Sequence, residues 1–184
     1  MNFGNPLAVA AIDIAMYDFR GKALNLSIAE LHGGRLRDQA SVYASAMNYT
    51  EGLDAEEQYP SEAAALVERG FGALKMRLGG LPMARGLAAA AAVRDAVGPG
   101  VLLMVDGNGP YSLSEAIQVG RGLEALNLYS FDEPLPQPNY TAYEILTDKL
   151  DIAVAAGEAL GSRGAFKAVL MHHSISIVPP DGSL

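Results

Sequence analysis

The 184-residue chain contains no cysteine. It therefore has no disulfides and no thiolate metal ligands, a composition typical of a cytoplasmic protein. It also lacks any apolar run approaching the ~18 residues that a membrane-spanning helix needs. The first apolar stretch is interrupted by Asp13, and no basic-then-apolar signal sequence precedes it. We therefore expect a cytoplasmic protein without a membrane partner.

Basic residues are scarce. Lysine and arginine total 13 against 21 aspartates and glutamates, which gives a formal net charge of −8. A nucleic-acid-binding protein attracts phosphates through a basic face, so we expect no nucleic-acid partner. If the ligand is itself an anion, cations must be placed locally to bind it.

The sequence alternates between short apolar runs and longer segments with helical spacing. This alternation predicts an α/β fold with one parallel sheet. Expected helix N-caps are Ser61 and Ser112, and Gly70 and Gly98 are expected just after a last turn. The expected strands are 41–46, 72–78, 101–105, 128–131, 152–156 and 174–178, and the expected helices are 6–24, 60–69, 82–97, 112–126, 140–149 and 162–171.

An acidic residue follows four successive apolar runs: Asp106, Asp132, Glu158 and Asp181. They are spaced roughly 25 residues apart, one strand–helix unit each, so in a parallel barrel they converge at one rim. Each acid taken alone could cap a helix or accept loop hydrogen bonds. Together they favour a shared divalent cation, and all-oxygen ligands favour Mg²⁺, with Mn²⁺ as the alternative.

Two cations stand in the second expected strand. Lys75 and Arg77 are two residues apart, so their side chains share one face, which points into a barrel. They either form ion pairs with the acids or bind the carboxylate of a substrate. A doubly wound nucleotide-binding fold is the remaining alternative, but it requires a glycine-rich turn after the first strand, which 45–52 (SAMNYTEG) does not supply.

Six motifs, in this order, resemble the enolase superfamily in its mandelate racemase/muconate lactonizing enzyme branch. The resemblance implies a TIM-type (β/α) barrel, of which this chain contains about six strands with alternating helices. The motifs are AIDIAMYDFRGKALNLSIAELHGG (11–34), GFGALKMRLG (70–79), MVDGN (104–108), FDEP (131–134), AAGE (155–158) and ISIVPPD (175–181).

The resemblance also implies roles for individual residues. Asp106, Asp132 and Glu158 match the three Mg²⁺ ligands, which leaves Glu133 outside the ligand set. Lys75 and Arg77 match the Lys-x-Lys pair that acts on the substrate carboxylate, and Asn108 follows the first ligand toward metal or substrate. Asp181 matches the aspartate that orients a catalytic histidine.

The implied reaction is removal of a proton next to a carboxylate, through an enediolate held by Mg²⁺. The second lysine of the pair is replaced by Arg77, which is a poor general base because arginine stays protonated. This replacement favours one-base dehydration of a sugar acid, a small-molecule carboxylate, by a lyase. Racemisation or epimerisation, which uses two bases, and cycloisomerisation are the alternatives.

The same resemblance divides the chain. Residues 1–40 match a bridging helix and loop, and residues 41–184 match an incomplete barrel without the capping domain and the last strands. We expect such a chain to lack full activity alone and to self-associate as a homo-oligomer through its exposed barrel edges. A non-catalytic, metal-binding remnant with an assembly role is the alternative.

Overall fold

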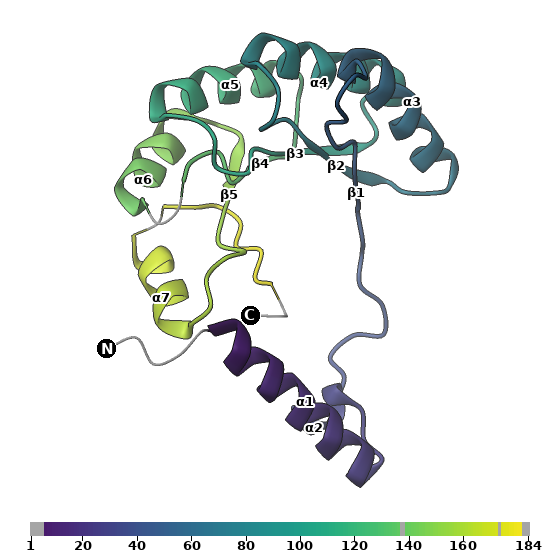
Figure 1. Cartoon of the computed structure of the whole chain (residues 1–184), viewed down its shortest axis with the longest axis vertical. Helices are drawn as coiled ribbons and strands as arrows, with labels where there is room; N and C mark the ends of the chain where they lie inside the picture. Colours follow the sequence, from purple (N-terminus) through teal and green to yellow (C-terminus); the bar gives the residue numbers. More distant parts are fainter. Residues whose placement is uncertain (1–5, 137–138, 173, 182–184) are drawn as a thin grey trace.

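The computed structural model of the chain describes residues 6–136, 139–172 and 174–181. Strands and helices alternate along it from β1 onward (Figure 1). The strands are β1 (Ala44–Ala46), β2 (Ala73–Arg77), β3 (Leu102–Asp106), β4 (Ser130–Asp132) and β5 (Ala153–Ala155). The helices are α1 (Pro6–Leu24), α2 (Ile28–Leu31), α3 (Ala55–Glu68), α4 (Met83–Val97), α5 (Leu113–Ala125), α6 (Tyr140–Lys149) and α7 (Arg163–Met171).

The strands form one parallel sheet in the order β1-β2-β3-β4-β5. The sheet curves, and the helices from α3 onward lie along its convex side (Figure 1). In the register, Arg77 pairs with Asp106 and Asp106 pairs with Asp132, so three strands end level with one another. The predicted α/β fold, a partial barrel of parallel strands, is confirmed.

Side chains alternate between the two faces of the sheet. Leu74, Met76, Leu103 and Val105 are fully buried in the hydrophobic core between sheet and helices. The residues between them in sequence therefore point to the concave face. This alternation places Arg77, Asp106 and Asp132, at the ends of β2, β3 and β4, on the inner side of the curved sheet.

The last predicted strand, 174–178, pairs with β5 at a single position. Ile177 forms an isolated parallel bridge with Ala155. Ser176 N–H and Ile177 N–H both donate to the Val154 carbonyl, at 2.8 and 3.1 Å. Pro179 and Pro180 follow, and proline cannot donate to a ladder. The pairing consequently extends over one bridge instead of a full strand.

Helix starts follow the capping residues. Ser112 caps α5 in a capping box with Glu115, as predicted. The predicted cap at Ser61 is wrong: α3 begins at Ala55, and the Asp54 side chain caps it by accepting from Glu56 N–H at 3.0 Å. The expected helix 60–69 therefore starts too late in the chain, and Pro60 lies inside α3.

The α1–α2 segment packs apart from the core. Large apolar side chains of α1 are exposed, among them Ile12 at 67% and Phe19 at 68%, and no α1 residue belongs to the core cluster. An extended stretch connects this segment to β1 (Figure 1). Within the described ranges, no helix is both long and apolar enough to cross a bilayer.

Arg94 of α4 binds the backbone just before β3 and β4, at the opposite end of these strands from the acidic residues. Its guanidinium donates to the carbonyls of Leu126, Gly98, Val101 and Asn127 at 2.8–3.1 Å. Burial lowers the pKa of Arg94. We expect Arg94→Ala to reduce the free energy of unfolding by about 2 kcal/mol, because four carbonyls, three of them in partly buried hydrogen bonds, lose their donor.

Urea denaturation followed by circular dichroism measures this loss. Arg94→Lys retains the charge but not the planar set of donors, so it should restore less than half of the stability. Arg37→Ala, at an exposed position, is the matched control. A stability loss no larger for Arg94→Ala than for Arg37→Ala would contradict this role.

Candidate functional site

The strand ends β2, β3 and β4 are held together by close backbone contacts. A Cβ placed on Gly79 would lie 1.7 Å from the Gly107 carbonyl oxygen. Gly107 N–H in turn donates to the Asp132 carbonyl at 2.7 Å. Glycine is required where one backbone approaches another this closely. The loops that follow the three strands are therefore stacked directly on one another.

Gly79→Ala should disturb this stacking. The added methyl group meets backbone, which cannot move aside as a flexible side chain would, so we expect a loss of about 1–3 kcal/mol in unfolding free energy. Gly72→Ala is the matched control, because a Cβ at Gly72 has no atom within 4 Å. Equal melting temperatures for the two variants would refute the close packing of the loops.

Lys75 lies between two buried aspartates. Its Nζ is 2.9 Å from Asp106 Oδ2 and also donates to Asp132 Oδ2. Lys75, Asp106 and Asp132 expose 6%, 1% and 4% of their surface. Lys75 was expected either to form ion pairs with the acids or to bind a substrate carboxylate. In the structure it forms the ion pairs. One ammonium group offsets two carboxylates in a region without bulk water.

The pKa of Lys75 lies above its ordinary value. Burial alone lowers the pKa, but hydrogen bonds and opposite charge from Asp132 and Asp106 outweigh burial and raise it. Lys75 is consequently a cation at neutral pH in this arrangement. A cation between two carboxylates suits electrostatic stabilisation of an anion better than the acceptance of a proton.

Arg77 extends the ion-pair network toward solvent. Its Nη1 lies 3.3 Å from Asp106 Oδ2 and donates to Asn108 Oδ1 at 2.9 Å. Asn108 N–H donates to Asp106 Oδ1 at 3.0 Å, so Asn108 bridges the two. The Arg77 side chain is 40% exposed. The guanidinium therefore stands at the open side of the cluster.

Asp132 retains one oxygen without a partner. Its Oδ1 is buried and accepts no hydrogen bond, although Oδ2 is bound to Lys75. An unsatisfied buried carboxylate oxygen is costly unless a cation or donor reaches it. Carboxylate oxygens are ligands that Mg²⁺ prefers. The donor set around Asp132 therefore fits a hard divalent cation.

Glu133 and Glu158 bring further negative charge to the same place. The pKa of Glu133 is raised, first by burial and then by the charges of Glu158, Asp132 and Asp106, whereas the Gly157 N–H that donates to its carboxylate lowers it. The Glu158 side chain is exposed. Three other carboxylates therefore lie within electrostatic reach of Glu133.

The acids do not form a closed cage. Across the part of the chain that the structure describes, no group of three or more His, Asp or Glu side chains is arranged to hold a metal ion. The Lys75 ammonium stands between Asp106 and Asp132 instead. Asp181 lies exposed, beyond the Ile177 bridge. The structure thus joins Lys75, Arg77, Asp106, Asn108 and Asp132 by direct contacts.

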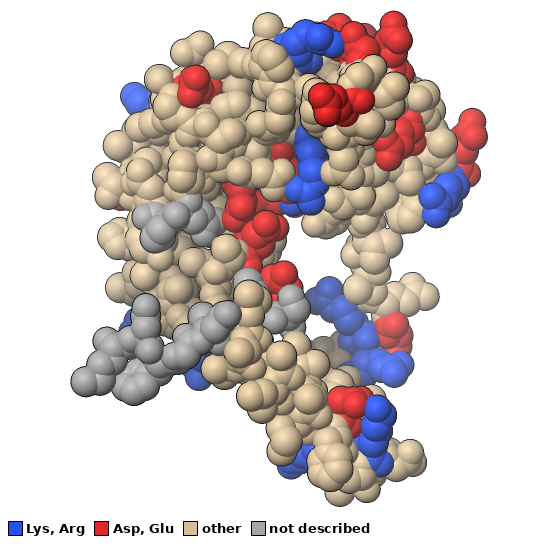
Figure 2. Space-filling model, in the orientation of Figure 1, with Lys and Arg blue, Asp and Glu red and all other residues tan. Residues whose placement is uncertain are grey.

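Acidic side chains gather beside basic ones on the concave side of the sheet (Figure 2). Backbone strain concentrates there too. Met47, Asn108 and Glu133, just after β1, β3 and β4, have positive φ angles of 56°, 57° and 42°. Such conformations are costly for methionine and glutamate and cluster at functional sites. Sequence reasoning placed Glu133 behind the metal ligands or in a purely structural role, and nothing in FDEP indicates its left-handed backbone.

Two family models match the chain. Residues 58–183 match the model described as Enolase C-terminal domain-like. Residues 1–33 match the Mandelate racemase / muconate lactonizing enzyme, N-terminal domain. The first match alone spans most of the chain, including β2 to β5 and the acids Asp106, Asp132, Glu133, Glu158 and Asp181.

Individual relatives are similar over nearly the whole chain. D-galactarolactone cycloisomerase of Agrobacterium fabrum is 33% identical over 174 residues, which is 95% of this chain and 46% of that protein. The crystal structure of the 3,6-anhydro-D-galactonate cycloisomerase from Zobellia galactanivorans matches with a TM-score of 0.89 and 32% identity, over 97% of this chain and 49% of that one.

D-glucarate dehydratase from Agrobacterium tumefaciens complexed with magnesium matches with a TM-score of 0.86 and 32% identity, over 95% of this chain and 48% of that one. This chain spans about half the length of the curated relatives it matches. These relatives are named as enzymes, cycloisomerases and a dehydratase. On its sequence, its fold and its family matches, the chain belongs to the mandelate racemase/muconate lactonizing enzyme family of the enolase superfamily.

Proposed function

We propose that this chain carries the Mg²⁺-binding and anion-binding side of a site that removes the proton next to the carboxylate of a sugar acid. The observation that supports this most is the Lys75 ammonium held between Asp106 and Asp132, with one buried Asp132 oxygen left unbonded. The level ends of adjacent parallel strands support it as well.

Asp106, Asp132 and Glu158 would hold the metal. A bound Mg²⁺ would supply positive charge against the carboxylate of the substrate. Lys75 supplies positive charge from this chain, because its pKa keeps it protonated. Lys75 favours the developing negative charge as the proton leaves, and a bound Mg²⁺ would add to that stabilisation.

Arg77 favours dehydration over racemisation. A racemase needs a second base, and a guanidinium that stays protonated cannot accept the proton. At the open side of the cluster, beside Asn108, Arg77 is placed to bind an anionic group of the substrate. We therefore propose a sugar-acid dehydratase, with cycloisomerisation as the alternative that the relatives support.

The test combines metal binding with proton exchange. Mg²⁺ is titrated into the chain by calorimetry, and a panel of aldonic and aldaric acids is then incubated with the chain and Mg²⁺ in D₂O. Nuclear magnetic resonance follows exchange of the α-proton and the appearance of a 2-keto-3-deoxy product. We expect one Mg²⁺ per chain and slow exchange with at least one acid, because Lys75 and Arg77 stay protonated and the α-proton must pass to a base in the buffer.

The outcomes separate the proposals. Exchange followed by water loss supports the dehydratase, whereas exchange without water loss favours an epimerase. Mg²⁺ binding without any exchange would favour a non-catalytic metal-binding role for this chain. Absence of Mg²⁺ binding would contradict the whole proposal.

A further inference from the structure

The loop after β4 is poor in backbone hydrogen-bond donors. Pro134 and Pro136 flank Leu135 and carry no N–H group, so Leu135 supplies the only N–H of residues 134–136. Leu135 is 2% exposed, and its N–H and carbonyl are therefore largely shielded from water. Buried backbone groups need partners, and a segment with two prolines is poorly suited to pairing with a strand. A side chain has to supply the partner.

Tyr143 of α6 satisfies both groups. Its hydroxyl donates to the Leu135 carbonyl at 2.7 Å and accepts from the Leu135 N–H at 3.4 Å. A tyrosine hydroxyl can donate once and also accept, so both of its functions are used on one residue. Tyr143 is itself only 2% exposed. This buried contact holds the loop after β4 at a fixed distance from α6.

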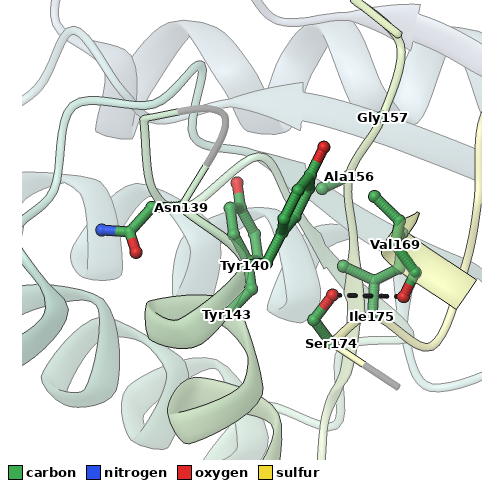
Figure 3. A pocket seen from close by; sticks show the side chains of 8 residues that line it. All are labelled: Asn139, Tyr140, Tyr143, Ala156, Gly157, Val169, Ser174 and Ile175. Atoms are coloured by element: carbon green, nitrogen blue, oxygen red, sulfur yellow. Dashed lines mark hydrogen bonds between the residues drawn. The ribbon is translucent and has the colours of Figure 1, made fainter. Parts of the chain in front are cut away.

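The ring of Tyr143 has a rigid support. It borders a cavity of about 10 Å³, beside Ala156 and Ser174 (Figure 3). That volume holds at most one water, so the ring has little room to turn. Further along α6, Thr147 Oγ1 donates to the Ser174 carbonyl at 3.0 Å and fixes the helix to the same wall. The hydroxyl therefore reaches Leu135 from a well-packed position.

The loop after β4 in turn supports the loop after β3. The Glu133 carbonyl accepts from Gly109 N–H at 2.6 Å. The Pro134 carbonyl accepts from Tyr111 N–H at 3.3 Å. Asn108, which belongs to the ion-pair network, directly precedes Gly109. A displacement of the first loop would therefore also displace the second.

Asp132, at the end of β4, depends on its backbone for its orientation. Among the described residues, Lys75 is the one donor to its carboxylate, and the buried Oδ1 has no partner. The Asp106 carboxylate, by contrast, lies within 3.3 Å of three polar partners. The backbone after Asp132 is strained, because Glu133 has a φ of +42°. Such a conformation persists where surrounding contacts hold it, and the contact of Tyr143 to the same loop is one of them.

We propose that Tyr143 is a positioning residue, whose hydroxyl fixes the loop after β4 so that Asp132 and Asn108 keep their places in the candidate site. The proposal rests on the Mg²⁺ site proposed above. Tyr143 acts through the backbone of Leu135 and not by direct contact with metal or substrate. Outer contacts of this kind orient metal ligands.

Tyr143→Phe tests this role. Phenylalanine retains the ring that packs beside the cavity and removes only the hydroxyl. We expect the Mg²⁺ affinity, measured by calorimetry, to fall by about tenfold, the lower end of what the loss of an outer contact costs. Tyr129→Phe is the matched control, because it removes the same hydroxyl from a side chain just before β4 that is 51% exposed. The control should bind Mg²⁺ as wild type does.

Arg94→Ala separates positioning from a general loss of stability. This variant also loses partly buried hydrogen bonds, but at the opposite end of β3 and β4. At a temperature where it stays folded, it should bind Mg²⁺ as tightly as wild type. A loss of affinity in Arg94→Ala as large as in Tyr143→Phe would overturn the proposal, because both variants would then report destabilisation alone.

Hydrogen exchange of the metal-free chain gives a second measurement. In Tyr143→Phe the Leu135 amide should exchange at least about tenfold faster, because its acceptor is gone, and the amides of Gly109 and Tyr111 should follow. Amides of α4 should keep their wild-type rates. Unchanged exchange of Leu135 and Gly109 would overturn the proposal, and so would unchanged Mg²⁺ affinity beside faster exchange. If wild type itself binds no Mg²⁺, the proposed function fails, and the exchange rates still decide whether Tyr143 orders the two loops.

Discussion

Lys75→Met lowers the free energy of unfolding of the metal-free chain by about 3–5 kcal/mol, the usual cost of removing one partner from a buried ion pair. Asp106 and Asp132 would then face each other in a buried site without the ammonium between them. Methionine occupies a similar volume, so the loss reports charge and hydrogen bonds and not a cavity. Urea denaturation in the presence of a chelator measures it.

Mg²⁺ should reverse much of this loss. A dication that binds the folded chain stabilises it by mass action. In Lys75→Met the cation meets two carboxylates that no ammonium offsets, so saturating Mg²⁺ should raise the stability of the variant more than that of wild type. Lys149→Met, at an exposed position of α6, is the control. A loss below about 1 kcal/mol would place Lys75 among ordinary surface ion pairs.

Asp106→Asn should greatly weaken Mg²⁺ binding and α-proton exchange while the chain stays folded. Asp106 Oδ2 accepts from Lys75 and Arg77, and Oδ1 accepts from Asn108 N–H. An amide keeps the shape of the side chain but carries no charge and directs an NH₂ group at one of these donors. We expect Mg²⁺ affinity to fall by at least about 100-fold, since even outer-contact changes cost about 10–100-fold.

Calorimetry measures the Mg²⁺ affinity. The rate of α-proton exchange should also fall, by about 1000-fold, as it does when a main electrostatic contact to the transition state is removed. Asp95→Asn, exposed on α4, is the matched control and should behave as wild type. Circular dichroism must show Asp106→Asn folded. Mg²⁺ affinity within threefold of wild type would exclude Asp106 as a ligand.

The fold was predictable because its local signals agree. The range 6–24 and the range 140–149 coincide with α1 and α6, and the capping box at Ser112 starts α5. Period-2 alternation in ALKMR places Lys75 inside the curved sheet. The prediction at Ser61 is wrong because the side chain of Asp54, earlier in the chain, accepts from Glu56 N–H and caps α3 there.

The candidate site was predictable only in part. Acids at strand ends indicate convergence, but sequence does not determine whether Lys75 binds those acids or a substrate; in the structure Lys75 pairs with Asp106 and Asp132. The left-handed backbone of Glu133 and the four carbonyls bound by Arg94 leave no local pattern, because both depend on tertiary contacts. Periodicity and capping rules describe local sequence, so they do not predict tertiary contacts of this kind.

Anomalous scattering from crystals of the chain grown with Mn²⁺ tests the proposed metal site most directly. We expect a single strong peak at roughly 2.0–2.3 Å from carboxylate oxygens of Asp106, Asp132 and Glu158, with Lys75 moved off the aspartates. A peak bound elsewhere, or no peak with Lys75 still paired to both aspartates at saturating Mn²⁺, would contradict the assignment.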